Sequence, residues 1–217
     1  MVANSGNNKP TVEEYHSSLE SRLGYRILLG NARHCGLWAK GTLWPFPISQ
    51  AQRAMEEKLY QRLSLREGSQ VLDAGAGSGL VAAYMAEHGL LVEAIDLTPA
   101  HVEQAKINVV SRGREQRVSV ELGDYHNLSR YREASFDGVY TMETFVHADE
   151  PREVLENFKR LLKPGGVLLL HEADVHRDSP VLHEVLRLSH CQNMLRAGTY
   201  EEMLATAGFE RIEVERT

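Results

Sequence analysis

The chain switches repeatedly between two spacings of its hydrophobic residues. Short apolar runs, which are typical of buried strands, occupy residues 71–74, 90–95, 118–122, 136–141, 167–170 and 209–214. Between them, apolar residues recur at helical spacing and predict helices at residues 12–29, 49–65, 80–86, 100–112, 151–162, 175–197 and 199–207. Strands that alternate with helices predict an α/β fold with a Rossmann-like, doubly wound and mostly parallel sheet.

Local signals at three of the predicted helix starts support these boundaries. Ser49 with Gln52, and Thr199 with Glu202, have the spacing of a capping box, in which each side chain bonds a free backbone N–H. Thr98 stands just before a proline and is the expected N-cap of the helix that follows the second strand. The sequence therefore predicts side-chain caps at all three starts.

A glycine-rich turn joins the first strand to the next helix. Glycine is needed where the backbone has a positive φ or approaches a ligand closely, so a nucleotide-like ligand is expected here rather than a turn that serves packing alone. A dinucleotide fingerprint has the spacing G-x-G-x-x-G, whereas Gly75, Gly77 and Gly79 stand at alternate positions and Asp73 precedes them. This D-x-G-x-G-x-G form resembles the first motif of class I S-adenosylmethionine-dependent methyltransferases, in which the acidic residue faces the methionine end of the cofactor.

The resemblance implies S-adenosyl-L-methionine as the cofactor. Asp96 ends the second strand about 20 residues after the glycine turn, where a carboxylate can accept hydrogen bonds from both ribose hydroxyls. The alternative for Asp96 is electrostatic stabilisation of the next helix start. In the resembled family the acidic residue after the third strand bonds the adenine amino group, which assigns that role to Asp124, with Tyr125 or its backbone beside the ring. The alternative for Asp124 is a solvent-facing turn residue. The expected cofactor residues are completed by Leu97 and Thr141.

The block that follows the fourth strand carries the expected catalytic residues, Glu143 and His147. Ligands in open α/β sheets bind outside the carboxyl ends of the strands, which places both residues beside the reactive methyl group. The block resembles that of sterol C-methyltransferases, where a Glu and a His hold the same relative places. With an alkene acceptor, Glu143 and nearby aromatic rings could stabilise a carbocation and His147 could remove the proton, whereas for an oxygen or nitrogen acceptor His147 would be the base directly. The alternative for His147 is a structural hydrogen bond near a helix start.

Two aromatic stretches before the core, residues 31–38 and 43–47, are too apolar for an ordinary surface loop. They are either hydrophobic filling or a lid over an apolar substrate. They resemble the N-terminal cofactor cover of sterol, tocopherol and cyclopropane-fatty-acid methyltransferases, which favours the lid. Residues 175–197 are interpreted equally well as a cap over the substrate cleft or as an ordinary crossover helix. The expected lid residues are Tyr25, His34, Trp38 and Trp44.

The length of 217 residues, 42% of them hydrophobic, predicts one domain with a sizeable core. Residues 1–217 are expected to form a single methyltransferase domain. Its parts are a flexible tail at 1–10, N-terminal helices and lid at 11–66, a cofactor-binding core at 67–174, the candidate cap at 175–197, and a last helix and strand at 198–217. The resembled fold adds a seventh, antiparallel strand that is apparently missing here. The sheet is thus expected to be incomplete, rearranged or completed by a partner, or the sequence is a truncated form.

Charge and composition exclude several classes of partner. A net charge of -6, with no dense cluster of Lys and Arg, disfavours a nucleic acid substrate. A polar N-terminus and the lack of a long apolar run predict a soluble, cytoplasmic protein. Cys35 and Cys191 are far apart and suggest no disulfide framework. His171 and His176 miss the i, i+4 spacing of a helical zinc pair, so no metal is expected.

Together these features predict an S-adenosylmethionine-dependent methyltransferase similar to the sterol C-methyltransferase-like enzymes. The expected substrate is an apolar small molecule of secondary metabolism, such as a sterol, terpenoid or polyketide, and C-methylation is favoured over O- or N-methylation. Two alternatives remain open. One is a methyltransferase-like cyclase or pericyclase that retains the cofactor without methyl transfer, and the other is a non-catalytic cofactor-binding subunit. A homo-oligomer or a partner subunit is compatible with all three.

Overall fold

The computed structural model describes residues 34, 36–38, 47–172 and 198–215. Several predicted features lie outside these ranges, namely the tail at 1–10, the helix at 12–29, the lid residues Tyr25 and Trp44, and the cap at 175–197. Within the described ranges, no helix has both the length and the apolar character needed to cross a membrane.

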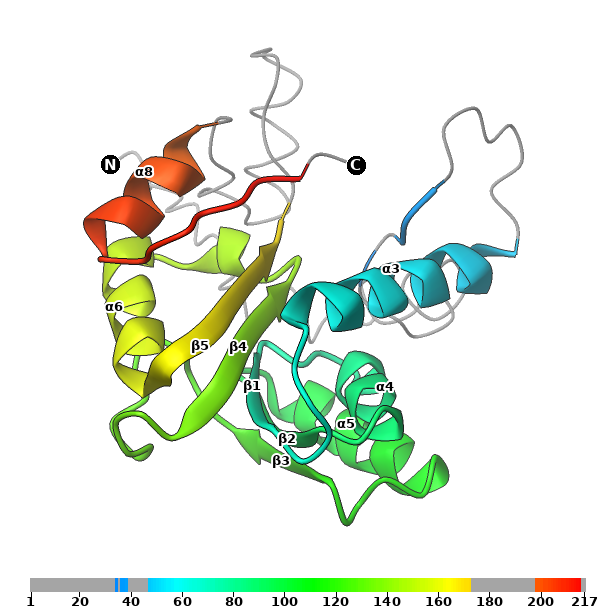
Figure 1. Cartoon of the computed structure of the whole chain (residues 1–217). Helices are drawn as coiled ribbons and strands as arrows, with labels where there is room; N and C mark the ends of the chain where they lie inside the picture. Colours follow the sequence, from blue (N-terminus) through cyan, green and yellow to red (C-terminus); the bar gives the residue numbers. More distant parts are fainter. Residues whose placement is uncertain (1–33, 35, 39–46, 173–197, 216–217) are drawn as a thin grey trace, which may run out of the picture.

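The described strands form one parallel sheet. Five strands lie in the order β3-β2-β1-β4-β5 (Figure 1), and all four neighbouring pairs are parallel. The strands are β1 (Gln70–Ala74), β2 (Leu91–Asp96), β3 (Val118–Leu122), β4 (Phe136–Met142) and β5 (Leu162–His171). Because helices flank this parallel sheet and connect all its strands except β3 and β4, the predicted doubly wound α/β class is confirmed.

Helices cover both faces of the sheet (Figure 1). Side chains of a strand alternate between its faces, so Val71 of β1 packs with α3, α4 and α5, whereas the next residue, Leu72, packs with α6 and α8. The two hydrophobic cores therefore lie on opposite sides of β1. The helices are α3 (Ile48–Leu63), α4 (Leu80–Glu87), α5 (Pro99–Ser111), the 3-10 helix η1 (Phe145–His147), α6 (Pro151–Leu161) and α8 (Thr199–Thr206).

The order of the strands creates a switch point between β1 and β4. From β1 the chain proceeds outward to β2 and β3 on one side, and then returns to form β4 and β5 on the other. Loops that leave β1 and β4 therefore diverge at the carboxyl ends of these strands, where open α/β sheets bind their ligands. The glycine turn and the loop that carries Glu143 and His147 are the two loops at this point.

The fifth strand begins earlier than predicted. β5 starts at Leu162, directly after α6, rather than at residue 167. The intervening residues are absorbed by a shift in register, since Phe136 of β4 pairs with Leu162 while Gly138 pairs with Val167. Such an irregularity depends on the neighbouring strand, so the local sequence did not indicate it.

The prediction of a strand at residues 209–214 is wrong. These residues form no strand, and Arg211 has a φ of 54°, which interrupts an extended backbone. The segment runs past β5 (Figure 1) and reaches α3, where Glu215 forms ion pairs with Lys58 at 2.9 Å and with Arg62. Side-chain contacts rather than strand pairing therefore hold this end of the described chain.

The predicted side-chain caps are also wrong. The N-cap of α3 is Pro47, two residues before the expected Ser49, and the N-cap of α8 is Gly198, one residue before the expected Thr199. Neither helix has a side-chain capping bond. Thr98 does hold the N-cap position of α5, yet its side chain makes no capping bond. Instead the backbone N–H of Thr98 donates to the Asp96 carboxylate at 2.9 Å. The carboxylate at the end of β2 thus fixes the backbone of the N-cap residue, and the cap that was expected from the threonine side chain does not form.

Candidate functional site

The glycine turn between β1 and α4 is fixed by hydrogen bonds to the end of β2. The N–H groups of Gly75 and Ala76 both donate to the Ile95 carbonyl at 2.9 Å. The N–H of Gly77 donates to Asp96 Oδ2 at 2.8 Å. The backbone of the turn therefore faces β2, and the predicted cofactor residues of the two strands lie next to each other.

Two of the three glycines are required by packing. Gly75 has a φ of 107°, and a Cβ at this position would lie 2.7 Å from Thr144 Cβ. A Cβ on Gly79 would lie 2.8 Å from the Ala105 Cβ of α5. Both approaches are closer than real Cβ atoms allow, so Gly75 makes room for the loop after β4 and Gly79 for α5. Gly77 also has a positive φ, 53°, and the predicted cofactor contacts of all three glycines stay predictions.

Asp73 is a buried carboxylate with an unsatisfied oxygen. Only 2% of the residue is exposed, and Oδ2 has no hydrogen-bond partner. Burial raises the pKa of this carboxyl to about 7; the nearby Tyr140 hydroxyl counters the shift without forming a hydrogen bond, and the charge of Asp96 adds to it. Asp73 lines a small cavity of about 30 Å³ together with the glycine turn, His34 and Met142. The position suits a cationic group of a ligand, because a positive charge would satisfy the orphaned oxygen.

Asp96 is bonded on both of its oxygens. Besides the N–H groups of Thr98 and Gly77, it interacts with His101 Nδ1, which lies 3.0 Å from Oδ1. Burial opposes ionisation, but the hydrogen bond and the charge of His101, together with the two backbone N–H groups, outweigh it and lower the pKa of the carboxyl. Asp96 is therefore an oriented carboxylate with lone pairs left on Oδ2 for a further donor. The sequence analysis did not foresee His101, which stands one helical turn after the strand end.

Asp124 and Tyr125 lie in the loop after β3. Asp124 Oδ1 lies 2.7 Å from His126 Nδ1, and His126 Nε2 accepts the Asp149 N–H at 3.2 Å. Since Nε2 accepts, the proton sits on Nδ1, and the imidazole donates to Asp124. The Tyr125 hydroxyl donates to the Thr144 carbonyl at 3.1 Å, and burial raises the pKa of this hydroxyl. Both residues thus tie the loop after β3 to the loop after β4, and their adenine contacts stay predictions.

Glu172 organises the loop after β4, and the sequence analysis missed it. Its Oε1 accepts the Thr141 hydroxyl at 2.7 Å and the Thr144 and Phe145 N–H groups at 3.3 and 2.9 Å, and Oε2 accepts the Val146 N–H at 3.4 Å. Burial raises the pKa of Glu172 to about 7, against the effect of these four hydrogen bonds. The signal that could have identified Glu172 is its place at the carboxyl end of a strand, as for Asp96. Thr141 is fully buried, and its expected cofactor contact stays a prediction.

The predicted catalytic residues both lie on this loop. Glu143 has a φ of 54°, unusual for a residue with a side chain, and its N–H donates to the His171 carbonyl at 2.8 Å. It lines a cavity of about 1040 Å³ between β5, α8 and residues 209–215. His147 ends η1, is half-buried, and does not line this cavity. The positive φ marks Glu143 as a constrained position, which is frequent at functional sites. Their catalytic roles stay predictions.

The described lid residues lie at two depths. His34 is buried, whereas Trp38 is half-buried. Leu97, the remaining predicted cofactor residue, is 47% exposed directly after β2 and can offer an apolar surface to a planar ring. Tyr25 and Trp44 lie outside the described residues.

The residues present fit S-adenosylmethionine. An orphaned carboxylate oxygen on β1, an oriented carboxylate on β2 and a glycine turn between them offer partners for an ammonium group and ribose hydroxyls in adjacent positions. Bound at this point, the cofactor would supply a sulfonium charge and a transferable methyl group.

A family model for the methyltransferase domain matches residues 48–214. The chain belongs to the methyltransferase-domain family. The matched range includes β1 to β5, the glycine turn and both loops of the switch point.

Individual relatives of this methyltransferase-domain protein have two kinds of activity in their names. An S-adenosyl-L-methionine-dependent Diels-Alderase, iccD, of Talaromyces variabilis is 36% identical over 93% of this chain and 74% of its own length. Methyltransferase GfsG of Streptomyces halstedii is 29% identical over 94% of this chain and 74% of its own length. The crystal structure of the [4+2]-cyclase SpnF superimposes with a TM-score of 0.73, at 25% identity, over 93% of this chain and 73% of that one.

These comparisons confirm the predicted class I methyltransferase fold and family. They also support the predicted cofactor at the level of the family, since S-adenosylmethionine is named for the Diels-Alderase relative. The finer prediction of a sterol C-methyltransferase-like subgroup receives no specific confirmation. The choice between methyl transfer and a cyclisation that retains the cofactor stays open, because relatives of both kinds match nearly the whole chain.

Proposed function

We propose that this protein is an S-adenosylmethionine-binding enzyme of small-molecule metabolism that catalyses an intramolecular [4+2] cycloaddition. The observation that carries the proposal is the 36% identity to a Diels-Alderase over 93% of the chain. The similarity to a [4+2]-cyclase structure at a TM-score of 0.73 supports it. Sequence patterns alone placed methyl transfer first, and the relatives bring the cyclase alternative to at least equal weight.

In this proposal the cofactor is held by carboxylates at the ends of three adjacent strands. Asp73 pairs with the methionine ammonium, Asp96 accepts from the ribose hydroxyls, and Asp124 with Leu97 holds the adenine. The orphaned Oδ2 of Asp73 and the oriented carboxylate of Asp96 support the first two contacts. A cofactor held in this way provides a fixed positive charge, whose effect is greatest in a site that excludes water.

The proposed substrate is an apolar molecule that carries a diene and a dienophile. The cavity of about 1040 Å³ next to Glu143 is lined by apolar residues of β5, α8 and the segment 209–215, and also by charged residues, among them Lys159 and Glu201, which could contact polar groups of such a molecule. A cycloaddition of this kind releases no proton and no leaving group. Glu143 and His147 are therefore proposed to orient a polarised group of the substrate, and positioning supplies most of the acceleration.

Methyl transfer is the second candidate function. The match to the methyltransferase-domain model and the 29% identity to a methyltransferase over 94% of the chain favour it. In that reaction His147 is proposed to accept the proton that the acceptor loses, and Glu143 to stabilise positive charge on it. The same cofactor contacts serve both reactions, so cofactor binding alone does not separate them.

Product mass separates the two candidates. The gene is deleted in its host, and the metabolite that accumulates is purified and incubated with the protein and methyl-labelled S-adenosylmethionine. The cyclase proposal expects a product with the same mass as this metabolite, without label and without S-adenosylhomocysteine. A labelled product that is heavier by a CH2 unit, formed together with S-adenosylhomocysteine, would refute it in favour of methyl transfer.

The matched controls test whether the cofactor is needed. Cofactor-depleted protein and the Asp96→Ala variant should both lose cyclisation. Unchanged turnover by depleted protein would contradict a role for the cofactor. A chain that binds S-adenosylmethionine but changes no metabolite of the deletion strain would instead support the non-catalytic subunit.

A further inference from the structure

Unsatisfied polar atoms from two elements meet at the small cavity beside the glycine turn. Asp73 Oδ2 and both ring nitrogens of His34 are buried without a hydrogen-bond partner, and each residue is only 2% exposed. Both residues line the same cavity of about 30 Å³. Buried polar groups are normally paired, and each one left unpaired destabilises the fold. The Asp73 oxygen can accept a hydrogen bond and the His34 imidazole can donate one. Together they fit a ligand that carries both a donor and an acceptor.

His34 is held at this cavity by backbone contacts with α3. Gln52 Nε2 donates to the His34 carbonyl at 3.4 Å, and the Leu37 N–H donates to the Ala51 carbonyl at 2.8 Å. A Cβ on Gly36 would lie 2.7 Å from the Ala51 carbonyl carbon, so a glycine is needed for this approach. The position of the imidazole is therefore determined by the docking of its backbone.

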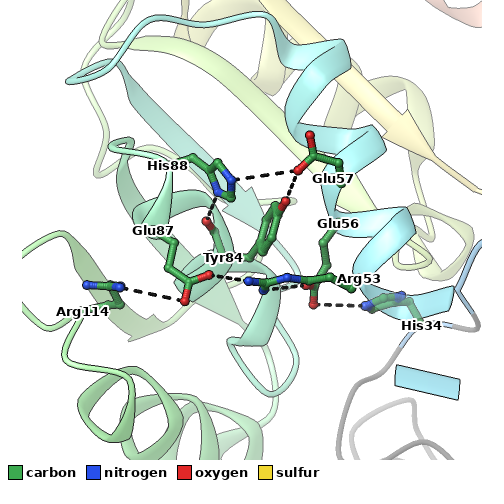
Figure 2. Close-up of polar contacts among 8 residues, drawn as sticks. All are labelled: His34, Arg53, Glu56, Glu57, Tyr84, Glu87, His88 and Arg114. Carbon is green, nitrogen blue, oxygen red and sulfur yellow. Dashed lines mark hydrogen bonds and ion pairs between the residues drawn. The ribbon is translucent and has the colours of Figure 1, made fainter. Parts of the chain in front are cut away.

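The Glu56 carboxylate lies near the imidazole of His34 (Figure 2). Glu56 Oε1 is 3.8 Å from His34 Nε2, within ion-pair range but beyond a hydrogen bond. Glu56 is only 5% exposed, and Arg53 joins it to α4, with Nη1 at 3.4 Å from Glu56 Oε2 and Nη2 at 2.8 Å from Glu87 Oε2. Figure 2 thus shows His34 at the end of a network that connects α3 to α4, the helix that begins at the glycine turn.

We infer that His34 binds the α-carboxylate of the cofactor's methionine moiety, opposite Asp73, which takes the ammonium group. The imidazole can donate a ring N–H to the ligand carboxylate, while its Nε2 lies 3.8 Å from Glu56 Oε1. The two groups of an amino acid lie on one carbon, which matches an acceptor and a donor that face one small cavity. A volume of about 30 Å³ admits a terminal charged group and excludes a nucleoside.

This inference rests on the proposed binding of S-adenosylmethionine and gives His34 a role different from the one expected in the substrate lid. Under the lid hypothesis His34 contacts the substrate. Its burial beside Asp73 and the glycine turn favours contact with the cofactor instead.

Titration calorimetry with three ligands tests the assignment. The ligands are S-adenosylmethionine, its decarboxylated form, which keeps the ammonium but lacks the carboxylate, and 5′-methylthioadenosine, which lacks the amino acid. Removal of a hydrogen bond to a charged group predicts that His34→Ala weakens binding of S-adenosylmethionine roughly ten- to hundredfold. The other two ligands should bind the variant as they bind the wild type, within about twofold. His34→Gln, which keeps an N–H donor, should recover part of the loss.

The matched control is His88→Ala. His88 lies next to this network, with Nε2 3.9 Å from Glu57 Oε2 and its ring beside Tyr84, over which Arg53 stacks. It does not line the cavity, so all three affinities should stay unchanged. Equal losses of all three ligands in His34→Ala, or an unchanged affinity for S-adenosylmethionine, would overturn the inference. A wild-type chain that binds none of the three would overturn the proposed function as well, which distinguishes the two failures.

Discussion

Replacement of Gly75 by alanine tests whether packing, rather than ligand contact alone, requires glycine in the turn. The φ of 107° lies in a region that residues with a Cβ rarely adopt, at a cost of about 1–2 kcal/mol. The added Cβ would also lie 2.7 and 2.8 Å from Thr144 Cβ and Cγ2. Overpacking of this kind costs about 1–3 kcal/mol, so Gly75→Ala should lower the free energy of unfolding by about 2–5 kcal/mol.

Gly68 offers a matched control for this experiment. It also has a positive φ, 81°, but a Cβ there would meet nothing within 4 Å. Gly68→Ala should therefore cost only the backbone strain, about 1–2 kcal/mol. Both variants are unfolded with urea without any ligand. Equal losses for Gly75→Ala and Gly68→Ala would refute the packing argument.

A double-mutant cycle locates the clash. Thr144→Ala removes the Oγ1 and Cγ2 atoms but also the hydrogen bond from Oγ1 to the Ala74 carbonyl at 3.0 Å. Combined with Gly75→Ala, it should destabilise the protein less than the sum of the two single changes, because the contacts of the added Cβ with Oγ1 and Cγ2 are gone while the contact with the Cβ of residue 144 remains. Strict additivity would place the strain elsewhere.

Three further outcomes are expected. Burial raises the pKa of Asp73 to about 7, while the ligand's ammonium group favours the ionised carboxylate. The affinity for S-adenosylmethionine should therefore fall by up to about tenfold for each pH unit below 7. Asp73→Asn should abolish this dependence in titrations from pH 5 to 7. Asp96→Ala should weaken cofactor binding at least about tenfold. Asp137 is the control, because its carboxylate lies at the opposite end of the sheet and accepts the Gln70 N–H at 2.8 Å. Asp137→Ala should leave cofactor binding unchanged. Glu172→Ala should cost about 1–3 kcal/mol in urea unfolding, since it leaves buried N–H groups unpaired, and an unchanged midpoint would contradict this.

Strands β1 to β4 and the helices between them could be predicted because their signals are local. Short apolar runs marked each of these strands to within one residue, and the glycine turn marked the switch point. The end of the chain was less predictable. The register shift of β5 depends on β4, and Arg211 adopts a positive φ that no local pattern indicates.

The sequence identified the predicted acidic residues of the site by their place at strand ends. It did not identify the groups with which these residues form hydrogen bonds. Asp96 was expected to bind ribose, yet its bonds to Gly77 and His101 depend on how the turn and α5 fold back on it. Glu172 accepts N–H groups that lie 26 to 28 positions earlier in the chain, so only the pairing of β4 with β5 brings them together. Side-chain capping was overestimated because the capping pattern identifies a residue type and a spacing but not the side-chain orientation; Thr98 holds the N-cap position of α5 without making a capping bond.

The hydrogen bonds of the glycine turn also have a consequence for nucleotide choice. In phosphate-binding loops the free N–H groups hold the anion, but here the N–H groups of Gly75, Ala76 and Gly77 already have acceptors within the protein. Carboxylates stand on either side of the same turn, at Asp73 and Asp96. These three N–H groups therefore offer a phosphate no donors, and the two carboxylates favour a ligand group that carries positive charge. This part of the turn is thus better suited to a cationic nucleoside than to an anion, and the property follows from its hydrogen bonds rather than from the spacing of its glycines.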